Sequence, residues 1–117
     1  MPRRANPAAV APLLKTTAPM FAALGDHTRL QLVDRLCNQG PQSIAQLTSG
    51  GRITRQAITK HLHVLAEAGL VHGLRAGRET LWELTPNQLR DAQRFLETIS
   101  RRWDDALARL QTKLERE

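Results

Sequence analysis

The sequence predicts a small, mainly α-helical domain with one β-hairpin, in the order α-α-α-α-β-β-α. Three observations carry this prediction. Apolar residues recur at steps of three and four over most of the chain, which is the period of amphipathic helices. The stretch 70–85 instead holds two apolar runs around Ala76-Gly77, which is typical of a hairpin. From residue 86 onward, apolar side chains recur at every seventh position, as in helices that pair with another helix.

The chain of 117 residues has the size of one ordinary domain. Residues 1–8 contain two prolines and two arginines, and we expect them to form a disordered N-terminal arm. Residues 9–117 then form a single domain. Within it we expect a core unit at 26–85, followed by a long C-terminal helix at 86–117.

The first two helices are predicted from their spacing and their end signals. From Ala9 the apolar spacing predicts a first helix that Gly25 ends, with Pro19 as a candidate for a bend or interruption. Asp26 occupies the N-cap position of a second helix, which ends by Gly40.

Two further helices follow in close succession. Ser43 and Gln46 match a capping box that opens a short helix, and the stretch 48–51 breaks it. Thr54 is placed to cap the next helix, and Gly69 suits its left-handed C-terminal position. The face of this helix predicted to point inward consists of Ala57, Ile58, Leu62 and Leu65.

The outer face of the helix that Thr54 caps is polar and carries hydrogen-bond donors. A short capped helix, a tight break and a second helix with such a face form a helix-turn-helix pattern, whose second helix fits the major groove of B-DNA. Arginine binds guanine and glutamine binds adenine bidentately, so we expect Arg55 and Gln56 to read bases, and Lys60 and His63 to reach phosphates. The alternative is a face that is only solvated. The predicted DNA contacts are Thr54, Arg55, Gln56, Thr59, Lys60 and His63.

The hairpin adds a second basic element. Arg75 and Arg78 flank its predicted two-residue turn, and a basic hairpin after a recognition helix is the winged helix-turn-helix arrangement, in which the tip contacts the DNA backbone or the minor groove. The alternative is a basic turn that keeps an edge strand soluble. His72 and Trp82 are expected to belong to the packing of the hairpin.

The distribution of charge agrees with a polyanionic partner. Residues 51–78 carry five basic side chains and one acidic side chain, whereas residues 79–117 carry seven basic and eight acidic ones. A basic surface on one part of a small domain suggests nucleic acid, here double-stranded DNA. The alternative reading of the charge is solubility alone.

The C-terminal helix carries an apolar seam too long to be covered by so small a domain. We therefore expect a homodimer in which this seam meets its copy, although packing within one chain against the first helix is the alternative. The predicted interface residues are Leu89, Ala92, Leu96, Ile99, Trp103, Ala106 and Leu110.

Several classes of site are not expected. Cys37 is the single cysteine, which excludes an intramolecular disulfide and a cysteine-rich zinc site, and we expect it to behave as a small apolar residue at the end of a core helix. His61 and His63 point to different sides of a helix and cannot chelate one ion. No catalytic set stands out, so we expect neither enzyme activity nor a cofactor or metal. The apolar runs fall short of the ~20 residues of a membrane span, and a cytoplasmic location is expected.

Three stretches together, FAALGDHTRLQLVDRLC, RQAITKHLHVLAEAGLV and GLRAGRETLWEL, resemble the ArsR/SmtB family of bacterial winged-helix repressors. The resemblance covers roughly residues 17–85. It implies a homodimer that is joined through the first and last helices and binds a palindromic operator. It also implies that 54–63 is the recognition segment and that Arg75 and Arg78 belong to the wing.

The sensor sites of the family are where this sequence departs from it. Metal-sensing members carry a cysteine pair near the short third helix, where this chain reads QSIAQLTSGG, and others bind zinc along a last helix that here has no histidine. The resemblance thus implies a branch without a metal effector, whose small-molecule effector is unknown. Two alternatives stay open: a ligand- or redox-responsive sensor with a pocket near the dimer helices, and a protein-interaction module that uses the C-terminal helix.

Overall fold

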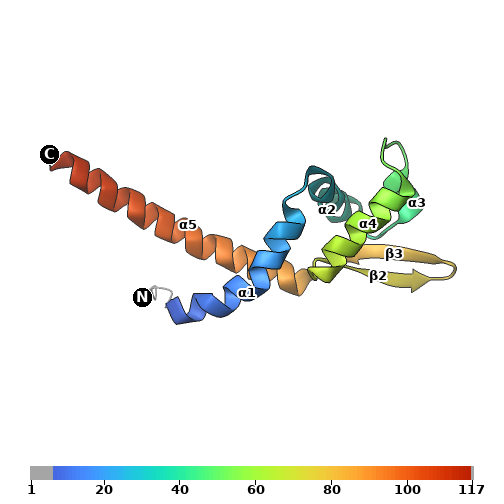
Figure 1. Ribbon diagram of the computed structural model, residues 1–117, viewed down its shortest axis with the longest axis horizontal. Helices are drawn as coiled ribbons and strands as arrows, with labels where there is room; N and C mark the ends of the chain where they lie inside the picture. The colour runs from blue at the N-terminus through green and yellow to red at the C-terminus, as the bar shows by residue number, and fades with distance from the viewer. Residues whose placement is uncertain (1–6, 117) are drawn as a thin grey trace.

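The computed structural model describes residues 7–116 (Figure 1). Most of the predicted N-terminal arm, residues 1–6, lies outside the described residues. The mainly α-helical fold class with a small β-sheet is confirmed. The elements are α1 (Pro7–Leu24), α2 (His27–Gln39), β1 (Gln42–Ser43), α3 (Ile44–Thr48), α4 (Arg55–Glu67), β2 (Val71–Ala76), β3 (Glu79–Leu84) and α5 (Pro86–Glu115).

Local signals set the ends of most helices as predicted. Asp26, Ser43 and Thr54 each accept a hydrogen bond from the backbone N–H three residues further on, and Gln46 completes the capping box of α3. These bonds satisfy backbone donors that the first turn of a helix leaves without partners. At the N-terminus the prediction differs, because α1 begins at Pro7 rather than at Ala9 and runs through Pro19 without interruption.

The sheet has a third strand that the sequence did not predict. Its order is β1-β3-β2, and all pairs are antiparallel. The two-residue strand β1 pairs Gln42 with Trp82 and Ser43 with Leu81, so β3 lies between the wing strand β2 and the strand that leads into α3.

The turn of the hairpin lies one residue later than predicted. Ala76 pairs with Glu79, which leaves Gly77 and Arg78 as the two loop residues. Gly77 has φ +65°, as the first central residue of a type II′ turn requires, and this turn matches the twist of the flanking strands. Arg78 therefore belongs to the turn itself rather than flanking it.

The core lies between the helices and one face of the sheet. Ile58, Leu62 and Leu65 of α4 are buried as predicted, while Ala57 at the edge of that face is only half-buried. Trp82 of β3 is also buried, in agreement with its predicted role in the packing of the hairpin. Residues of α1, α2, α3 and α5 complete this cluster, among them Met20, Leu32, Leu36, Leu47 and Ala92.

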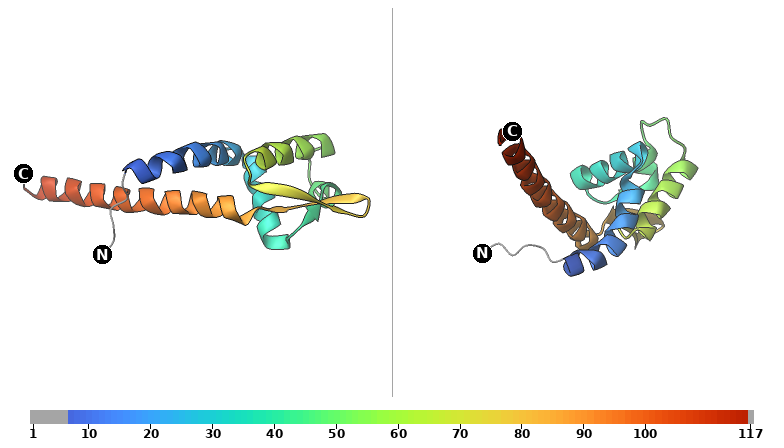
Figure 2. Two further views of the ribbon diagram at one scale, coloured as in Figure 1. Left: turned by 90° about the horizontal axis from the view of Figure 1, so that it is seen from below. Right: turned by 60° about the vertical axis from the view of Figure 1, so that its left-hand side comes forward.

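The molecule is elongated because α5 extends beyond the rest. It measures 65 × 28 × 21 Å, and its radius of gyration is 18.8 Å, whereas a compact domain of this length has about 13 Å. Helix α1 packs across the first part of α5 (Figures 1 and 2). At this contact the rings of Phe21 and Phe95 lie 5.8 Å apart. The C-terminal half of α5 projects past this contact (Figures 1 and 2).

The end of α4 is joined directly to the start of α5. Gly69 has φ +77°, the left-handed conformation predicted for it. With its amide nitrogen turned toward the backbone, Gln88 of α5 donates to the carbonyl oxygens of Ala68 at 2.9 Å and Gly69 at 2.7 Å. A side chain at position 69 would collide with Gln88, so the glycine also permits this close approach.

Candidate nucleic-acid interface

The predicted recognition residues lie together on the outer side of α4. The buried side chains of Ile58, Leu62 and Leu65 fix the opposite side of the helix to the core, so the polar side is held toward solvent. Except for Thr59, which is half-buried, all members of the set are exposed: Thr54, Arg55, Gln56, Lys60 and His63.

Three of these side chains have partners that limit what they offer to a ligand. The hydroxyl of Thr59 donates to the carbonyl oxygen of Arg55 at 2.7 Å. Thr59 can therefore offer a ligand only its methyl group and the lone pairs of its hydroxyl oxygen. Thr54 accepts the capping bond from Ala57 and keeps its own O–H as a donor. The His63 ring packs against Trp82 of β3, with ring centroids 6.0 Å apart, so a wing residue helps to hold it in place.

The N-terminal end of α4 is suited to a phosphate. Its first turn contains no acidic residue, and the helix dipole adds partial positive charge at this end. Arg52 is exposed two residues before the N-cap and was absent from the predicted set. A positive charge two residues before the N-cap Thr54 is the sequence feature that could have identified Arg52 as a DNA contact. Arg52 therefore joins Lys60 and His63 as a candidate contact to DNA phosphates.

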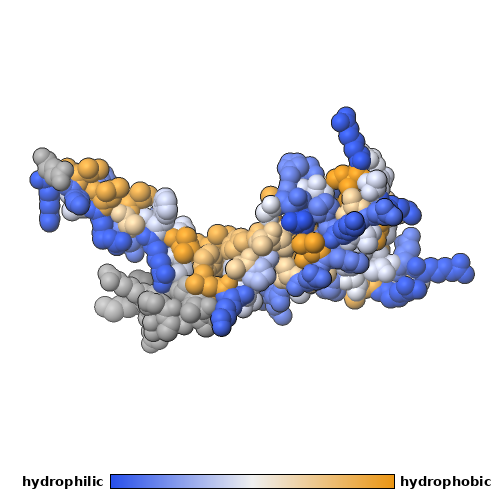
Figure 3. All heavy atoms as spheres, viewed as in Figure 1, coloured by the Kyte–Doolittle hydropathy of each residue, from blue (hydrophilic) through white to orange (hydrophobic). Residues whose placement is uncertain are grey.

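Arg75 and Arg78 are both exposed on the wing, Arg75 near the end of β2 and Arg78 in the turn. The tip of the hairpin and the N-terminal part of α4 lie at the end of the molecule remote from the C-terminus of α5 (Figures 1 and 2). Hydrophilic side chains gather at this end, whereas hydrophobic ones follow α5 and the middle of the molecule (Figure 3). The predicted base-reading and backbone-binding groups thus share one end.

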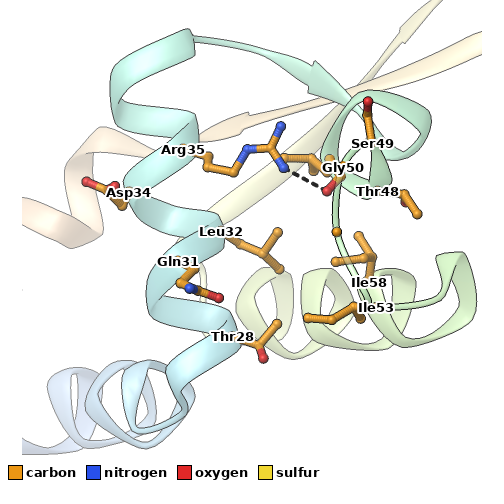
Figure 4. A pocket seen from close by; sticks show the side chains of 12 residues that line it. Thr28, Gln31, Leu32, Asp34, Arg35, Thr48, Ser49, Gly50, Ile53 and Ile58 are labelled. Atoms are coloured by element: carbon orange, nitrogen blue, oxygen red, sulfur yellow. Dashed lines mark hydrogen bonds between the residues drawn. The ribbon is translucent and has the colours of Figure 1, made fainter.

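A hollow of about 330 Å³ lies between α2 and the turn that joins α3 to α4 (Figure 4). Arg35 reaches across it from α2 and donates to the carbonyl oxygens of Leu47 at 2.8 Å and Gln46 at 3.0 Å. Because these carbonyls belong to the last turn of α3, the contact fixes the turn from which α4 starts. The alternative function of a sensor predicts a pocket near the dimer helices, whereas this hollow lies beside the helix-turn-helix.

The structure also bears on the site classes that were not expected. Within residues 7–116, no three or more His, Cys, Asp or Glu side chains are grouped as metal ligands would be. None of the described helices has the length and apolar character needed to cross a membrane. Cys37 is exposed, which corrects its expected role as a small core residue.

The seam of α5 divides into a covered part and an open part. Ala92 is buried in the core of its own chain and Leu89 is partly buried against it, which corrects the prediction that Ala92 is available to a partner. From Leu96 onward the seam is open, and Trp103 is 66% exposed. Its exposed apolar members are Leu96, Ile99, Trp103, Ala106, Leu107, Leu110 and Leu114.

Comparisons with known proteins agree with this geometry. Residues 24–73 match a family model described as a helix-turn-helix domain. The HTH-type transcriptional regulator YuzN of Bacillus subtilis is 43% identical in an alignment of 65 residues, with coverage of 50% of this chain and 71% of that protein. An ArsR-like transcriptional regulator from Rhodococcus sp. RHA1 is 34% identical, with a TM-score of 0.76, over 92% of this chain and 97% of that one. This chain belongs to the ArsR/SmtB family.

Membership of the ArsR/SmtB family confirms the resemblance predicted from the sequence and makes the protein a helix-turn-helix transcriptional regulator. In ArsR/SmtB terms, α3 and α4 are the helix-turn-helix and β2 and β3 are the wing. A homodimeric winged helix-turn-helix DNA-binding domain from Mycobacterium bovis, a possible ArsR-family regulator, has the same fold, with a TM-score of 0.61 over 90% of this chain and 92% of that one at 23% identity.

Proposed function

We propose that this ArsR/SmtB protein is a homodimeric repressor that binds a palindromic operator and responds to no metal. The observation that carries the proposal is the exposed polar side of α4, which its apolar side fixes to the core and whose N-terminal part shares one end of the molecule with the basic tip of the wing (Figure 1). A helix mounted in this way can enter the major groove without rearranging.

The residues of α4 and the wing would divide the work of recognition. Arg55 would bind the O6 and N7 atoms of a guanine, and Gln56 would bind the N6 and N7 atoms of an adenine. Thr59, whose hydroxyl proton is engaged, would offer its methyl group to a thymine methyl. Phosphates would be bound by Thr54, Lys60, His63, Arg75 and Arg78, with Arg52 added from the structure.

Dimerisation would proceed through α1 and the open part of the α5 seam. Contiguous exposed apolar side chains mark interaction surfaces, and a helix with an apolar stripe is most simply covered by a copy of itself. The Mycobacterium bovis domain of the same fold is a homodimer. A two-fold symmetric dimer presents two α4 helices to half-sites about one helical turn apart, which is why the operator would be palindromic.

Regulation of this kind requires no catalysis and no cofactor. Repression would follow from occupying a promoter, and the protein would work in the cytoplasm, where the DNA lies. The sequence QSIAQLTSGG contributes neither cysteine nor histidine around α3, and α5 contributes no histidine, which favours an effector other than a metal ion.

Selection of bound DNA from a random-sequence library at near-physiological salt tests the proposal. We expect a two-fold symmetric motif whose half-sites are about 10 base pairs apart. Recovery of no motif, with binding that disappears as the salt concentration rises, would contradict sequence-specific recognition and leave only a basic surface. That result would favour the alternative of a protein-interaction module built on α5.

A further inference from the structure

A polar cluster lies behind the recognition helix, on the side that faces the junction of α1 and α2. The side chain of Arg29 donates through Nε to the carbonyl oxygen of Ala23, in the last turn of α1. Its Nη1 atom lies 3.2 Å from Nδ1 of His61, on α4. Asp26 accepts a hydrogen bond from the backbone N–H of Arg29 at 3.0 Å, and its carboxylate lies 3.9 Å from the same His61 nitrogen.

The chemistry of this contact determines the form of the imidazole. A guanidinium only donates hydrogen bonds, so Nδ1 of His61 must accept, and the ring is neutral with its proton on Nε2. A protonated imidazole has an N–H at both nitrogens and a positive charge. It would therefore lose the hydrogen bond and face a second cation, while the Asp26 carboxylate beside it would become an attractive partner.

We propose that His61 is a positioning residue of the DNA-binding surface: the neutral ring holds α4 to Arg29, and its protonation moves the contact to Asp26 and weakens operator binding. The inference rests on the proposed function, since it concerns the same DNA-binding surface.

The location of the cluster explains why a small shift there would matter for DNA. Arg29 contacts α1, which belongs to the proposed dimer interface, and α4, which carries the recognition residues. A change in how α4 sits against α1 therefore changes the position of both recognition helices relative to the two-fold axis. Both half-sites of a palindrome would be affected together.

Among the described residues, Asp26 and Arg29 are the charged groups that contact His61. Both come from the α1–α2 junction, and the His61 side chain is 24% exposed between them and α4. On α4 itself the residues one turn away carry no charge: Ala57, Ile58, Val64 and Leu65. The hydrogen bond from the Arg29 backbone N–H is the main cause that lowers the pKa of Asp26, so this carboxylate stays ionised where histidines titrate.

The test compares operator binding by the wild type and by His61→Asn between pH 8 and pH 5.5 at constant ionic strength. An asparagine oxygen can stand near the position of Nδ1 and accept from Arg29, but it does not titrate. We expect equal affinity at pH 8 and, at pH 5.5, affinity about three- to tenfold weaker for the wild type than for the variant, as expected for one hydrogen bond. His27→Asn is the matched control, because His27 is exposed on α2, and it should follow the wild type.

Other results would overturn the inference. If the wild type and His61→Asn changed in parallel with pH while both bound the operator at pH 8, the inference would fail and the proposed function would stand. If the wild type bound no DNA at pH 8, both would fail. Nitrogen-15 NMR of the histidine rings in the free protein gives a readout without DNA, and a proton on Nδ1 of His61 at pH 8 would contradict the proposed contact.

A second variant keeps the test decisive if His61→Asn does not fold. Asp26→Asn retains a residue that caps α2 but removes the charge to which a protonated His61 would turn. We expect its operator affinity to fall less steeply than that of the wild type as the pH drops, because without the carboxylate protonation of His61 is less favoured and the ring has no new partner. An unchanged pH profile would contradict the proposed exchange of partners.

Discussion

Helix α4 and the C-terminal half of α5 are both amphipathic, but they expose opposite faces. In α4 the apolar face is buried in the core and the polar face meets solvent. In α5 beyond Leu96 no described part of the chain covers the apolar face, and Trp103 and Leu110 are more than half exposed. The proposed partners would complement these faces: a polyanion for α4 and an apolar helix for α5.

The difference teaches where affinity and selectivity would come from. An exposed row of donors and cations on a fixed helix discriminates among partners by hydrogen-bond geometry. An exposed apolar stripe discriminates little but contributes free energy in proportion to the area it buries. Substitutions in α5 should accordingly weaken the dimer, whereas substitutions in α4 and the wing should weaken or change DNA binding. Three predictions test this difference.

The largest effect is expected from Trp103→Glu in α5. It places a charge in the middle of the open seam, and loss of a central aromatic residue commonly costs an interface at least about 2 kcal/mol. The dimer dissociation constant, measured by analytical ultracentrifugation, should rise by roughly thirtyfold or more.

Ala108→Glu provides the matched control for Trp103→Glu. Ala108 is exposed, and it lies two positions from Ala106 and from Leu110, which puts it on the side of α5 away from the seam. The substitution adds the same charge to the same helix and should leave the dimer intact. Equal dissociation by the two variants would mean that added charge rather than a specific apolar interface determines assembly.

A smaller effect is expected from Arg55→Ala in α4. If Arg55 binds a guanine, its removal should weaken operator binding by about 1–3 kcal/mol and relax the preference at one base position per half-site. Competition binding with operators changed at single positions measures both quantities. An equal loss on every sequence would instead identify Arg55 as a phosphate contact.

The smallest effect is expected from Arg75→Ala or Arg78→Ala in the wing. A lost phosphate contact should lower the slope of log affinity against log salt by about one while leaving the preferred sequence unchanged. Titrations at several salt concentrations provide the slope. A changed base preference would show that the wing reads sequence.

Local interactions explain why much of the fold was predictable. The caps at Asp26, Ser43 and Thr54, and the left-handed Gly69, depend on residues within a few positions of each other. The inward face of α4 follows from helical spacing alone. For the same reason the exposed side of α4 could be named from the sequence, because it is what remains once the buried side is assigned.

Tertiary contacts explain what was missed. Strand β1 has two residues, too few for an alternating pattern, and exists because β3 is beside it. The seam of α5 is continuous in the sequence, yet α1 and the core bury Ala92 and leave Trp103 open. The contact between Arg29 and His61 joins residues that are 32 positions apart, which no local pattern could reveal.

The central place of β3 in the sheet has a consequence for how the wing can move. Leu81 of β3 pairs with Ser43, the residue that caps α3, so the root of the hairpin is hydrogen-bonded to the entry of the helix-turn-helix. Residues 75–79 lie beyond this pairing and are exposed. We therefore expect bending to be confined to the outer part of the hairpin, so that the tip could adjust to DNA of different curvature while the root keeps its distance to α4.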